Sequence, residues 1–294
     1  MKLSAFGPGK VNLCLLLGPP RADGRHELVT LIESVSLADA LHLETLAAGP
    51  DQIICPGVEG ENLAALALAG LRARGWDGPP VRIEIDKRVP VAAGMGGGSA
   101  DAAATLRLAA ELAPGRPEEV IALAAQLGAD VPSQLAPGVS LATGIGDIVE
   151  VCDPLAAHGL LLVPQPYALS TAEVYREADR LGLPRAPEDL DARFRALTDA
   201  MHDGARLPSA HIVNDLQPAA LSLCPPIESA LAAARDTGAD EVLVSGSGPT
   251  VAGLFWGSDG ADRAAAAARS LSTQWDRASS AVPVSPQFGL PVVA

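Results

Sequence analysis

The stretch Pro90-Val-Ala-Ala-Gly94-Met-Gly96-Gly97-Gly98-Ser99-Ala100-Asp101 decides the fold. Its four glycines within five positions let the backbone turn several N–H groups toward one point. The Ala- and Leu-rich run that follows predicts a helix from about Ser99 to Leu112, which should end before Pro114. Because the positive end of that helix lies at the same point, the stretch predicts an anion-binding loop between a strand and a helix.

Regular patterns on both sides of this loop predict its neighbours. Apolar and polar residues alternate over 81–86 and 41–44, which is typical of half-buried strands. Between them, residues 62–74 should form a helix that begins with a capping Asn and is followed by a Gly. After the loop, a Pro at the first position and a closing Gly predict a helix over 117–128.

The second half of the chain has a different texture and predicts a second domain. An acidic turn and a short apolar strand closed by prolines mark a boundary within 151–166, so we predict domains over 1–152 and 153–294. The further elements that we expect are strands over 160–163, 241–245 and 251–256, helices over 171–179, 225–237 and 261–272, and a loose helical excursion over 183–209. Helices and strands in this order favour an α+β fold.

The charge balance excludes some classes of protein. Asp and Glu outnumber Lys and Arg by 35 to 21, which gives a net charge of −14 at pH 7, whereas a nucleic-acid binder normally carries a positive field. Such an acidic protein must bind an anion through a local device. Only three of the basic residues are lysines, namely Lys2, Lys10 and Lys87.

Other features of the sequence favour a cytoplasmic protein without a zinc site. No uninterrupted apolar run is long enough to cross a membrane, and no secretory leader is recognisable at the N-terminus. The four cysteines are far apart and form no CxxC pair, and the five histidines show no ligand spacing. We therefore expect no membrane, no nucleic acid, no disulfide framework and no zinc site.

The glycine-rich loop does not match the common nucleotide-binding motifs. It lacks the Gly-Lys-Ser/Thr of a Walker A loop, and Ser99 occupies the place of the last glycine of a dinucleotide-binding GxGxxG. Taken alone, the loop could equally be a tight connection between two elements.

Three further segments carry polar groups of catalytic character. They are Gly7–Leu13 with Lys10, Leu127–Pro132 with Asp130, and the turn Ser245–Thr250. Singly, they indicate no more than an exposed lysine, a turn aspartate and a connection between strands. Their joint occurrence in this order is more specific.

The segment Pro8–Leu13, the glycine-rich loop and the turn Ser245–Thr250 together resemble the three motifs of the GHMP small-molecule kinase superfamily. The resemblance implies a two-domain α+β fold. An N-terminal ATP-binding domain and a C-terminal ferredoxin-like α/β sandwich would enclose the active site in the cleft between them.

Four more segments narrow this resemblance to one branch of the superfamily: Asp23–Leu28, Leu127–Pro132, Ser170–Tyr175 and Asn214–Leu216. Kinases of that branch transfer the γ-phosphoryl group of ATP to the 2-hydroxyl of 4-diphosphocytidyl-2-C-methyl-D-erythritol, in the non-mevalonate route to isoprenoids. The resemblance implies the same reaction here. Its substrates would be ATP with Mg²⁺ and a cytidine diphosphate-linked polyol, with no tightly bound organic cofactor.

The resemblance also implies roles for individual residues. Asp130 would accept or orient the proton of the substrate hydroxyl, and Lys10 would stabilise the developing alkoxide. Ser99 would hold a phosphate oxygen or the Mg²⁺ ion. The implied ATP-binding set is Asn62, Lys87, Pro90, Val91, Ala92, Ala93, Gly94, Met95, Gly96, Gly97, Gly98, Ser99 and Ala100, and the implied substrate-binding set is Asn12, Arg25, His26, Thr171, Tyr175 and Ser247.

Three sites depart from the pattern of the family. Arg25 stands where a tyrosine usually precedes His26, although a guanidinium plane can also stack on a base. Ser133 and Gln134 stand where aromatic residues are common, and Gly9 stands where the family more often has Ala. None of these departures removes a catalytic group.

Three alternatives remain open at this point. A sibling kinase acting on homoserine, mevalonate or a sugar would share the loop and the last motif, but not the segment Asp23–Leu28. A non-catalytic nucleotide-binding homologue would have no use for both Lys10 and Asp130. An NAD-dependent oxidoreductase would need a complete GxGxxG. The assembly is expected to be a monomer or a homodimer.

Overall fold

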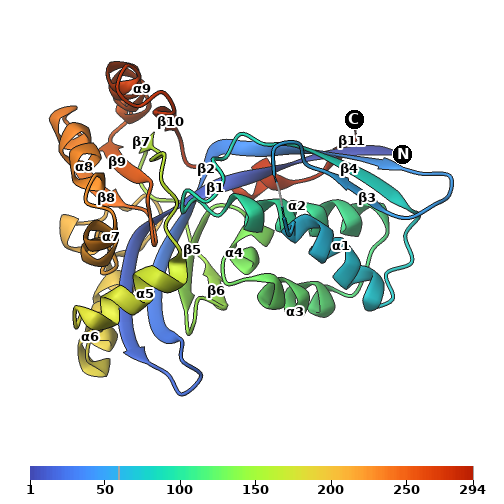
Figure 1. The fold of residues 1–294 in the computed structure, drawn as a ribbon, viewed down its shortest axis with the longest axis horizontal. Helices are drawn as coiled ribbons and strands as arrows, with labels where there is room; N and C mark the ends of the chain where they lie inside the picture. Colours follow the sequence, from blue (N-terminus) through green and yellow to red (C-terminus); the bar gives the residue numbers. More distant parts are fainter. Residues whose placement is uncertain (59, 294) are drawn as a thin grey trace.

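The computed structural model describes residues 1–58 and 60–293, and its first sheet is built on one long hairpin (Figure 1). Strands β1 (Lys2–Pro20) and β2 (His26–Thr45) pair antiparallel along most of their length. One half of β2 also pairs with β4 (Val81–Asp86), which is parallel to β3 (Gln52–Ile54). The other half pairs with β5 (Val139–Thr143), followed by β6 (Ile148–Val151).

Four helices cover one face of this sheet. They are α1 (Leu63–Ala73), α2 (Gly97–Leu112), α3 (Pro117–Leu127) and the single turn α4 (Val131–Leu135). Helix α2 is Ala-rich and is buried almost all round, which lets it lie close to β1. A Cβ atom on Gly7 of β1 would lie 3.1 Å from the backbone of Ala100, so small residues on both elements allow this approach.

The second sheet is antiparallel, with the order β10 (Ser279–Ala281), β7 (His158–Val163), β9 (Val251–Trp256) and β8 (Glu241–Val244). Strands β7 and β9 are buried along their whole length. Helices α8 (Ile227–Asp236) and α9 (Gly260–Leu271) pack on one face of this sheet, and a core shared with the first sheet covers the other. The remaining helices of this half are α5 (Thr171–Arg180), α6 (Pro187–Ala200), α7 (Gln217–Leu223) and the 3₁₀ turn η1 (Ser209–His211).

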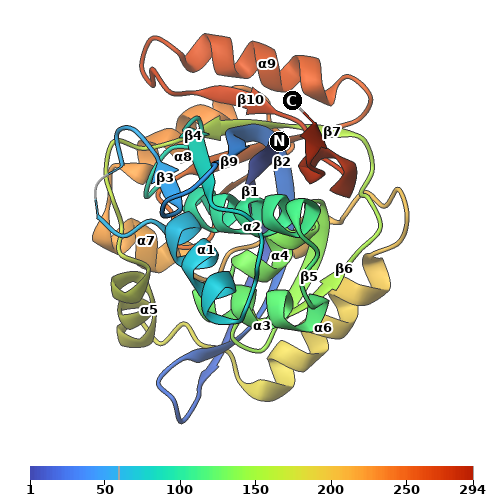
Figure 2. The ribbon, with the colours of Figure 1, turned by 90° about the vertical axis from the view of Figure 1, so that its right-hand side faces the viewer.

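The end of the chain returns to the first sheet. After β10, the tail forms the 3₁₀ turn η2 (Pro286–Gly289) and the short strand β11 (Val292–Val293). Strand β11 pairs antiparallel with Leu3 and Ser4 of β1, so the two termini lie near each other (Figure 2). The tail therefore belongs spatially to the half of the molecule that carries the glycine-rich loop.

The α+β class and most predicted elements are confirmed. The helix over 171–179 begins at its capping Ser170, whose side chain accepts a hydrogen bond from the Glu173 N–H, and the helices over 62–74 and 117–128 lie where expected. No helix within the described residues is both long and apolar enough to cross a membrane. Among the same residues, all four cysteines are free.

Two details of the sequence prediction differ from the structure. The expected loose excursion over 183–209 contains a regular fourteen-residue helix, α6, whose Leu190 and Leu197 are buried at a seven-residue spacing. Helix α2 begins two residues before the expected Ser99, since its N-cap is Gly96 in a left-handed conformation. The turn that carries Asp130 lies where expected, at residues 129 and 130, and leads directly into α4.

Candidate active site

The glycine-rich loop runs from Pro90 to Gly96 and leads directly into α2. Gly94 and Gly96 have φ of 76° and 66°, which other residues rarely adopt. A Cβ atom on Gly94 would lie 2.5 Å from the carbonyl oxygen of Gly248, so the turn between β8 and β9 packs directly on the loop. The Thr250 N–H also donates to the Ala93 carbonyl at 3.3 Å. The loop is thereby held in one conformation by the other half of the molecule.

A cavity of about 330 Å³ lies over this loop. Every residue from Pro90 to Ser99 lines it, and so do Asn62 and Lys87, as the resemblance implied for the nucleotide. Ala100 does not line the cavity, because it is buried inside α2. The remaining lining residues are Cys55, Val58, Glu61, Leu63 and Asp101.

Lys87 is held in this wall by two carboxylates. Its Nζ atom contacts Asp39 and lies 2.8 Å from Oδ2 of Asp101. Asp39 also accepts hydrogen bonds from the Arg88 and Val89 N–H groups, at 2.6 and 2.8 Å. Burial by itself would lower the pKa of Lys87, but the two carboxylates outweigh it and hold that pKa above its usual value. Burial raises the pKa of Asp101, against the opposing effect of Lys87.

Lys10 and Asp130 come together beneath the loop. The Lys10 Nζ atom lies 3.5 Å from Asp130 Oδ2 and donates to Asn12 Oδ1 at 2.6 Å. The Lys10 side chain is 5% exposed, whereas that of Asp130 is 36% exposed. Residues 120 positions apart in the chain thus form one charged pair with one open side.

The β1 strand aims Lys10 and Asn12 by two irregularities. Its pairing with β2 shifts register between Pro8 and Lys10, and again between Asn12 and Cys14. Such bulges re-aim side chains at the edge of a regular ladder. The Lys10 N–H donates to the Met95 carbonyl at 2.9 Å, which ties this strand to the glycine-rich loop.

A second cavity, of about 320 Å³, opens in front of Lys10 and Asp130. It shares Gly94, Gly96 and Ser99 with the first cavity, so the two spaces meet at the glycine-rich loop. Its lining includes the other predicted substrate residues Asn12, Thr171, Tyr175 and Ser247. The rest of the lining is Leu15, Leu28, Thr30, Ile32, Ala129, Ile145, Gly146, Leu216 and Gly246.

Tyr175, Thr171 and Ser247 form the wall opposite β1. The hydroxyls of Thr171 and Ser247 lie 3.0 Å apart and link α5 to the turn between β8 and β9. Tyr175 faces the cavity from α5, and burial together with the Asp130 charge raises the pKa of Tyr175 to about 12. Its hydroxyl is therefore a neutral hydrogen-bond donor at physiological pH.

Arg25 and His26 lie outside both cavities. His26 is buried, its Nε2 atom lies 2.7 Å from Asp179 Oδ1, and its ring centroid is 5.4 Å from that of Tyr175. Arg25 is exposed in the turn between β1 and β2, where its N–H donates to Asp23 Oδ1 at 3.0 Å. His26 therefore contacts Tyr175 without lining the cavity, and Arg25 lies in the exposed turn before His26.

Sequence reasoning missed the polar groups that orient Asn12. Its side-chain amide donates to the Thr30 hydroxyl at 2.8 Å, and its backbone N–H donates to Ser245 Oγ at 3.3 Å. Ser245 stood at the start of a turn already singled out, whereas Thr30 lies in the middle of β2 with no local signal. Asp39, the partner of Lys87, was missed for the same reason.

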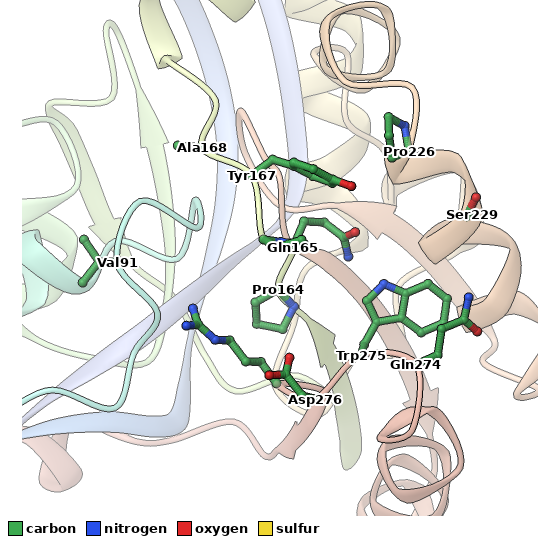
Figure 3. Close-up of a pocket in the computed structure, with 12 residues that line it drawn as sticks. Val91, Pro164, Gln165, Tyr167, Ala168, Pro226, Ser229, Gln274, Trp275 and Asp276 are labelled. Atoms are coloured by element: carbon green, nitrogen blue, oxygen red, sulfur yellow. The ribbon is translucent and has the colours of Figure 1, made fainter.

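A further cavity does not include the Lys10–Asp130 pair, although it shares Val91 with the cavity over the glycine-rich loop. It has a volume of about 540 Å³ and is lined mainly by residues 164–168 and 274–277. Figure 3 shows Val91 of the glycine-rich loop on one side, facing Gln165, Tyr167 and Trp275 across the gap. Neither Lys10 nor Asp130 lines it, so its size does not make it the reactive site.

Within residues 1–58 and 60–293, no group of three or more His, Cys, Asp or Glu side chains is placed to hold a metal ion. Mg²⁺ commonly binds through substrate phosphates with one or two protein oxygens. The Ser99 side chain, at the junction of the two cavities, fits that pattern.

Comparison with known proteins bears on both halves of the chain. Residues 62–138 match the GHMP kinases N terminal domain, and residues 189–274 match the GHMP kinases C terminal domain. The 4-diphosphocytidyl-2-C-methyl-D-erythritol kinase of Corynebacterium efficiens is 39% identical over 86% of this chain and 84% of its own length. That of Mycolicibacterium gilvum is 43% identical over 84% of this chain and 80% of its own length.

A solved structure agrees with these sequence relatives. The crystal structure of a 4-(cytidine 5'-diphospho)-2C-methyl-D-erythritol kinase superposes with a TM-score of 0.72 at 34% identity. The match covers 95% of this chain and 98% of the other. It includes both sheets and the cleft that contains Lys10 and Asp130.

Proposed function

The chain belongs to the 4-diphosphocytidyl-2-C-methyl-D-erythritol kinases, a branch of the GHMP kinases, and we propose that Lys10 and Asp130 carry out its phosphoryl transfer. It is an ATP-dependent kinase of the non-mevalonate isoprenoid route, and it phosphorylates the 2-hydroxyl of 4-diphosphocytidyl-2-C-methyl-D-erythritol. The proposal concerns which residues perform the reaction and how they do so.

One observation carries the assignment of the reactive centre. The Lys10–Asp130 pair lines the second cavity, which is the acceptor cavity in this scheme. That cavity shares Gly94, Gly96 and Ser99 with the first cavity, which is the nucleotide cavity. A Cβ atom on Gly96 would lie 3.0 Å from Lys10 Cγ and 3.7 Å from Asp130 Oδ2. The phosphoryl group therefore needs to cross only the glycine-rich loop to reach an acceptor oxygen beside Asp130.

Asp130 acts on the acceptor hydroxyl in this scheme. Its carboxylate accepts the hydroxyl proton as the hydroxyl oxygen forms its bond to the γ-phosphorus atom of ATP. The bond from that phosphorus to the bridging oxygen breaks at the same time, and its electron pair leaves with ADP. Little other covalent chemistry is required, since phosphoryl transfer is accelerated mainly by positioning and charge stabilisation.

Lys10 supplies the charge for this step. Its ammonium is buried, is aimed by the Asn12 amide oxygen and stands beside the developing alkoxide and the transferred phosphoryl group. A pre-oriented cation in a site with little water stabilises the transition state more strongly than a solvated one would. Asn12 is oriented in turn by Thr30 and Ser245, so the lysine does not have to reorganise during the reaction.

The glycine-rich loop and α2 bind the nucleotide phosphates in our scheme. The backbone N–H groups at the start of α2 and its dipole favour a negative group there. Asn62 and Lys87 line the same cavity, and we assign them to the adenosine side. Mg²⁺ supplies charge neutralisation for ATP when bound, and the Ser99 hydroxyl is the side chain that would hold it or a phosphate oxygen.

We assign the cytidyl end of the acceptor to the outer part of the second cavity. Tyr175 presents a ring and a neutral hydroxyl there, and Thr171 and Ser247 add hydroxyls on the same wall. His26 contacts Tyr175 without lining the cavity, and the exposed guanidinium of Arg25 is free to cover the base. An aromatic or guanidinium plane stacks on a pyrimidine without needing an exact hydrogen-bond pattern.

Measurement of ATP consumption by the purified protein tests the function. The assay contains Mg²⁺ and 4-diphosphocytidyl-2-C-methyl-D-erythritol, with the same polyol lacking its cytidyl group, homoserine and mevalonate in parallel. We expect turnover with the intact cytidyl substrate alone. Turnover with homoserine or mevalonate instead, or ATP binding without any turnover, would contradict the assigned reaction.

A further inference from the structure

We infer that Arg107 is a positioning residue for Asp130, an inference that rests on the role proposed above for Asp130. Arg107 lies on α2, and its guanidinium donates to backbone carbonyls of three separate segments. Nη1 contacts the Gln134 carbonyl of α4, Nη2 lies 2.7 Å from the Phe6 carbonyl of β1, and Nε lies 2.8 Å from the Gly289 carbonyl of η2. It therefore joins the strand of Lys10, the helix after Asp130 and the C-terminal tail.

The environment of Arg107 differs from that of an ordinary ion pair. No carboxylate of the described residues forms a salt bridge with the half-buried Arg107, and its hydrogen-bond partners are the three backbone carbonyls. Burial lowers the pKa of Arg107 to about 10, so it still carries its charge at neutral pH. Only the planar fork of a guanidinium can serve three carbonyls that point from different directions.

Helix α4 connects Arg107 to the reactive carboxylate. This helix begins at Val131, directly after Asp130, and has only five residues. At its start, Ser133 Oγ donates to the Asp130 carbonyl at 2.9 Å, and in its last turn the Gln134 carbonyl accepts from Arg107. A single turn has little stability of its own, so these two contacts set its orientation and thus the direction of the Asp130 side chain.

Arg107 also helps to fix the positions of Lys10 and Asp130 relative to one helix, α2. The glycine-rich loop leads into the N-terminus of α2, and its Gly96 lies beside Lys10. Arg107, ten residues after the first residue of α2, contacts α4. Helices α2 and α4 pack against each other beneath the sheet (Figure 1). Any rotation of α4 relative to α2 would change the distance between Lys10 and Asp130.

The C-terminal tail provides the third backbone carbonyl that Arg107 contacts. The Phe288 ring stacks on Phe6 with centroids 4.9 Å apart, and Gly289 fits where a Cβ atom would lie 2.7 Å from Pro137. These contacts place the Gly289 carbonyl within hydrogen-bond distance of Arg107. The return of the chain end to the first sheet thus contributes to the site, although no tail residue lines either cavity of the cleft.

Arg107→Met and Arg107→Lys test the inference in the full-length protein. We expect kcat to fall about 10- to 100-fold in the Met variant, because small misplacements of a reactive group have effects of this size. The KM for ATP should stay within about threefold, and the Lys variant should recover part of the kcat loss, since one carbonyl can still be reached. Hydrogen exchange of amides 129–136 should accelerate, while that of the second sheet should not.

Arg72→Met is the matched control. Arg72 also donates to backbone carbonyls, those of Gly78 and Pro79, but it lies at the far end of α1 and is paired with Asp51. We expect this variant to lower the melting temperature without lowering kcat. Phe288→Ala provides a milder test at the tail, with a smaller loss of kcat in the same direction, if Arg107→Met does not fold.

Several results would overturn the inference. A wild-type kcat in Arg107→Met and Phe288→Ala would do so, and so would equal loss of kcat in the Arg72 control. Unchanged exchange at 129–136 in the Arg107 variants would also contradict it, whether or not the protein turns over the cytidyl substrate. Absence of turnover in the wild type would instead refute the proposed function, and the exchange measurement would still decide the positioning of α4.

Discussion

The buried Lys10 and the half-buried Lys87 lie beside the same loop, and their surroundings differ in one respect. Lys87 is enclosed by Asp39 and Asp101, both within direct ion-pair distance, and Asp39 is fully buried. Lys10 is held mainly by the neutral amide oxygen of Asn12, and its one carboxylate, Asp130, is at 3.5 Å and partly exposed.

This difference separates a cation that shapes the cavity from one that acts in it. The charge of Lys87 is fully compensated by two carboxylates, so little of its field reaches a bound nucleotide. Asn12 orients Lys10 without neutralising it, which leaves its charge available to an incoming phosphoryl group. The kind of group that accepts a hydrogen bond from each lysine, a neutral amide or a carboxylate, therefore helps to identify the lysine that acts in the reaction.

Among the variants considered, Asp130→Asn should cause the largest loss of kcat. The variant keeps the shape of the side chain but cannot accept the hydroxyl proton, so kcat should fall by about 10²–10⁴. ATP affinity, measured by calorimetry, should stay nearly the same because the nucleotide cavity does not include Asp130. Full activity in this variant would contradict the role of Asp130.

Lys87→Met should act on stability instead. Its loss leaves two buried carboxylates next to each other without a counter-charge, which typically costs about 3–5 kcal/mol in the free energy of unfolding. Urea denaturation of Lys87→Met and Lys10→Met measures the contrast. Lys10→Met should lose less stability and far more kcat, and the reverse order would show that Lys87 is the reactive cation.

Gly96→Ala should disturb Lys10 by steric contact. The new methyl group would lie 3.0 Å from Lys10 Cγ in a left-handed backbone conformation, which costs about 1–2 kcal/mol for a residue with a Cβ. We expect kcat to fall about tenfold, as for other small displacements of reactive groups. Gly204→Ala is the control, because Gly204 has a similar φ of 69°, its Cβ would meet no atom within 4 Å, and it lines neither cavity of the cleft. Equal kcat for both variants would argue against contact between the loop and Lys10.

Arg25→Ala should have the smallest effect, since this cation is exposed and contacts no described wall of the cavity. We expect weaker binding of the cytidyl substrate by less than about tenfold, within the range of exposed cation–π contacts, and unchanged ATP binding. Isothermal titration with each ligand distinguishes these effects. Equal weakening of both ligands would show that Arg25 acts through the hairpin and not at the base.

The sequence predicts helices well where their ends carry a capping residue, a proline or a glycine. The capping Asn62 and Ser170 and the prolines and glycines at helix ends placed several helices almost correctly. Strand β1 escaped prediction, and only residues 41–44 of β2 were predicted, because both strands are buried for most of their length and lack a clean alternation elsewhere. Helix α6 escaped because its Pro-, Asp- and Arg-rich sequence conceals two buried leucines.

The site is predictable in its motifs and not in its geometry. Motif order indicated Lys10, Asp130 and the glycine-rich loop, but no local pattern links Lys87 to Asp39, which lies 48 residues earlier. Gln134 offers a further example, because its buried side-chain amide has no hydrogen-bond partner and only its backbone carbonyl explains its place. Contacts of this kind arise from the pairing of distant segments, which single-residue patterns do not encode.

A double-mutant cycle on Lys10 and Asp130 tests the central claim most directly. Single-turnover rates of phosphoryl transfer to the cytidyl substrate would be measured for Lys10→Met, Asp130→Asn and the double variant. If the two residues act as one unit, the double variant should be little slower than the slower single variant. Losses that multiply independently would contradict a coupled pair, and would place one of the two residues outside the phosphoryl-transfer step.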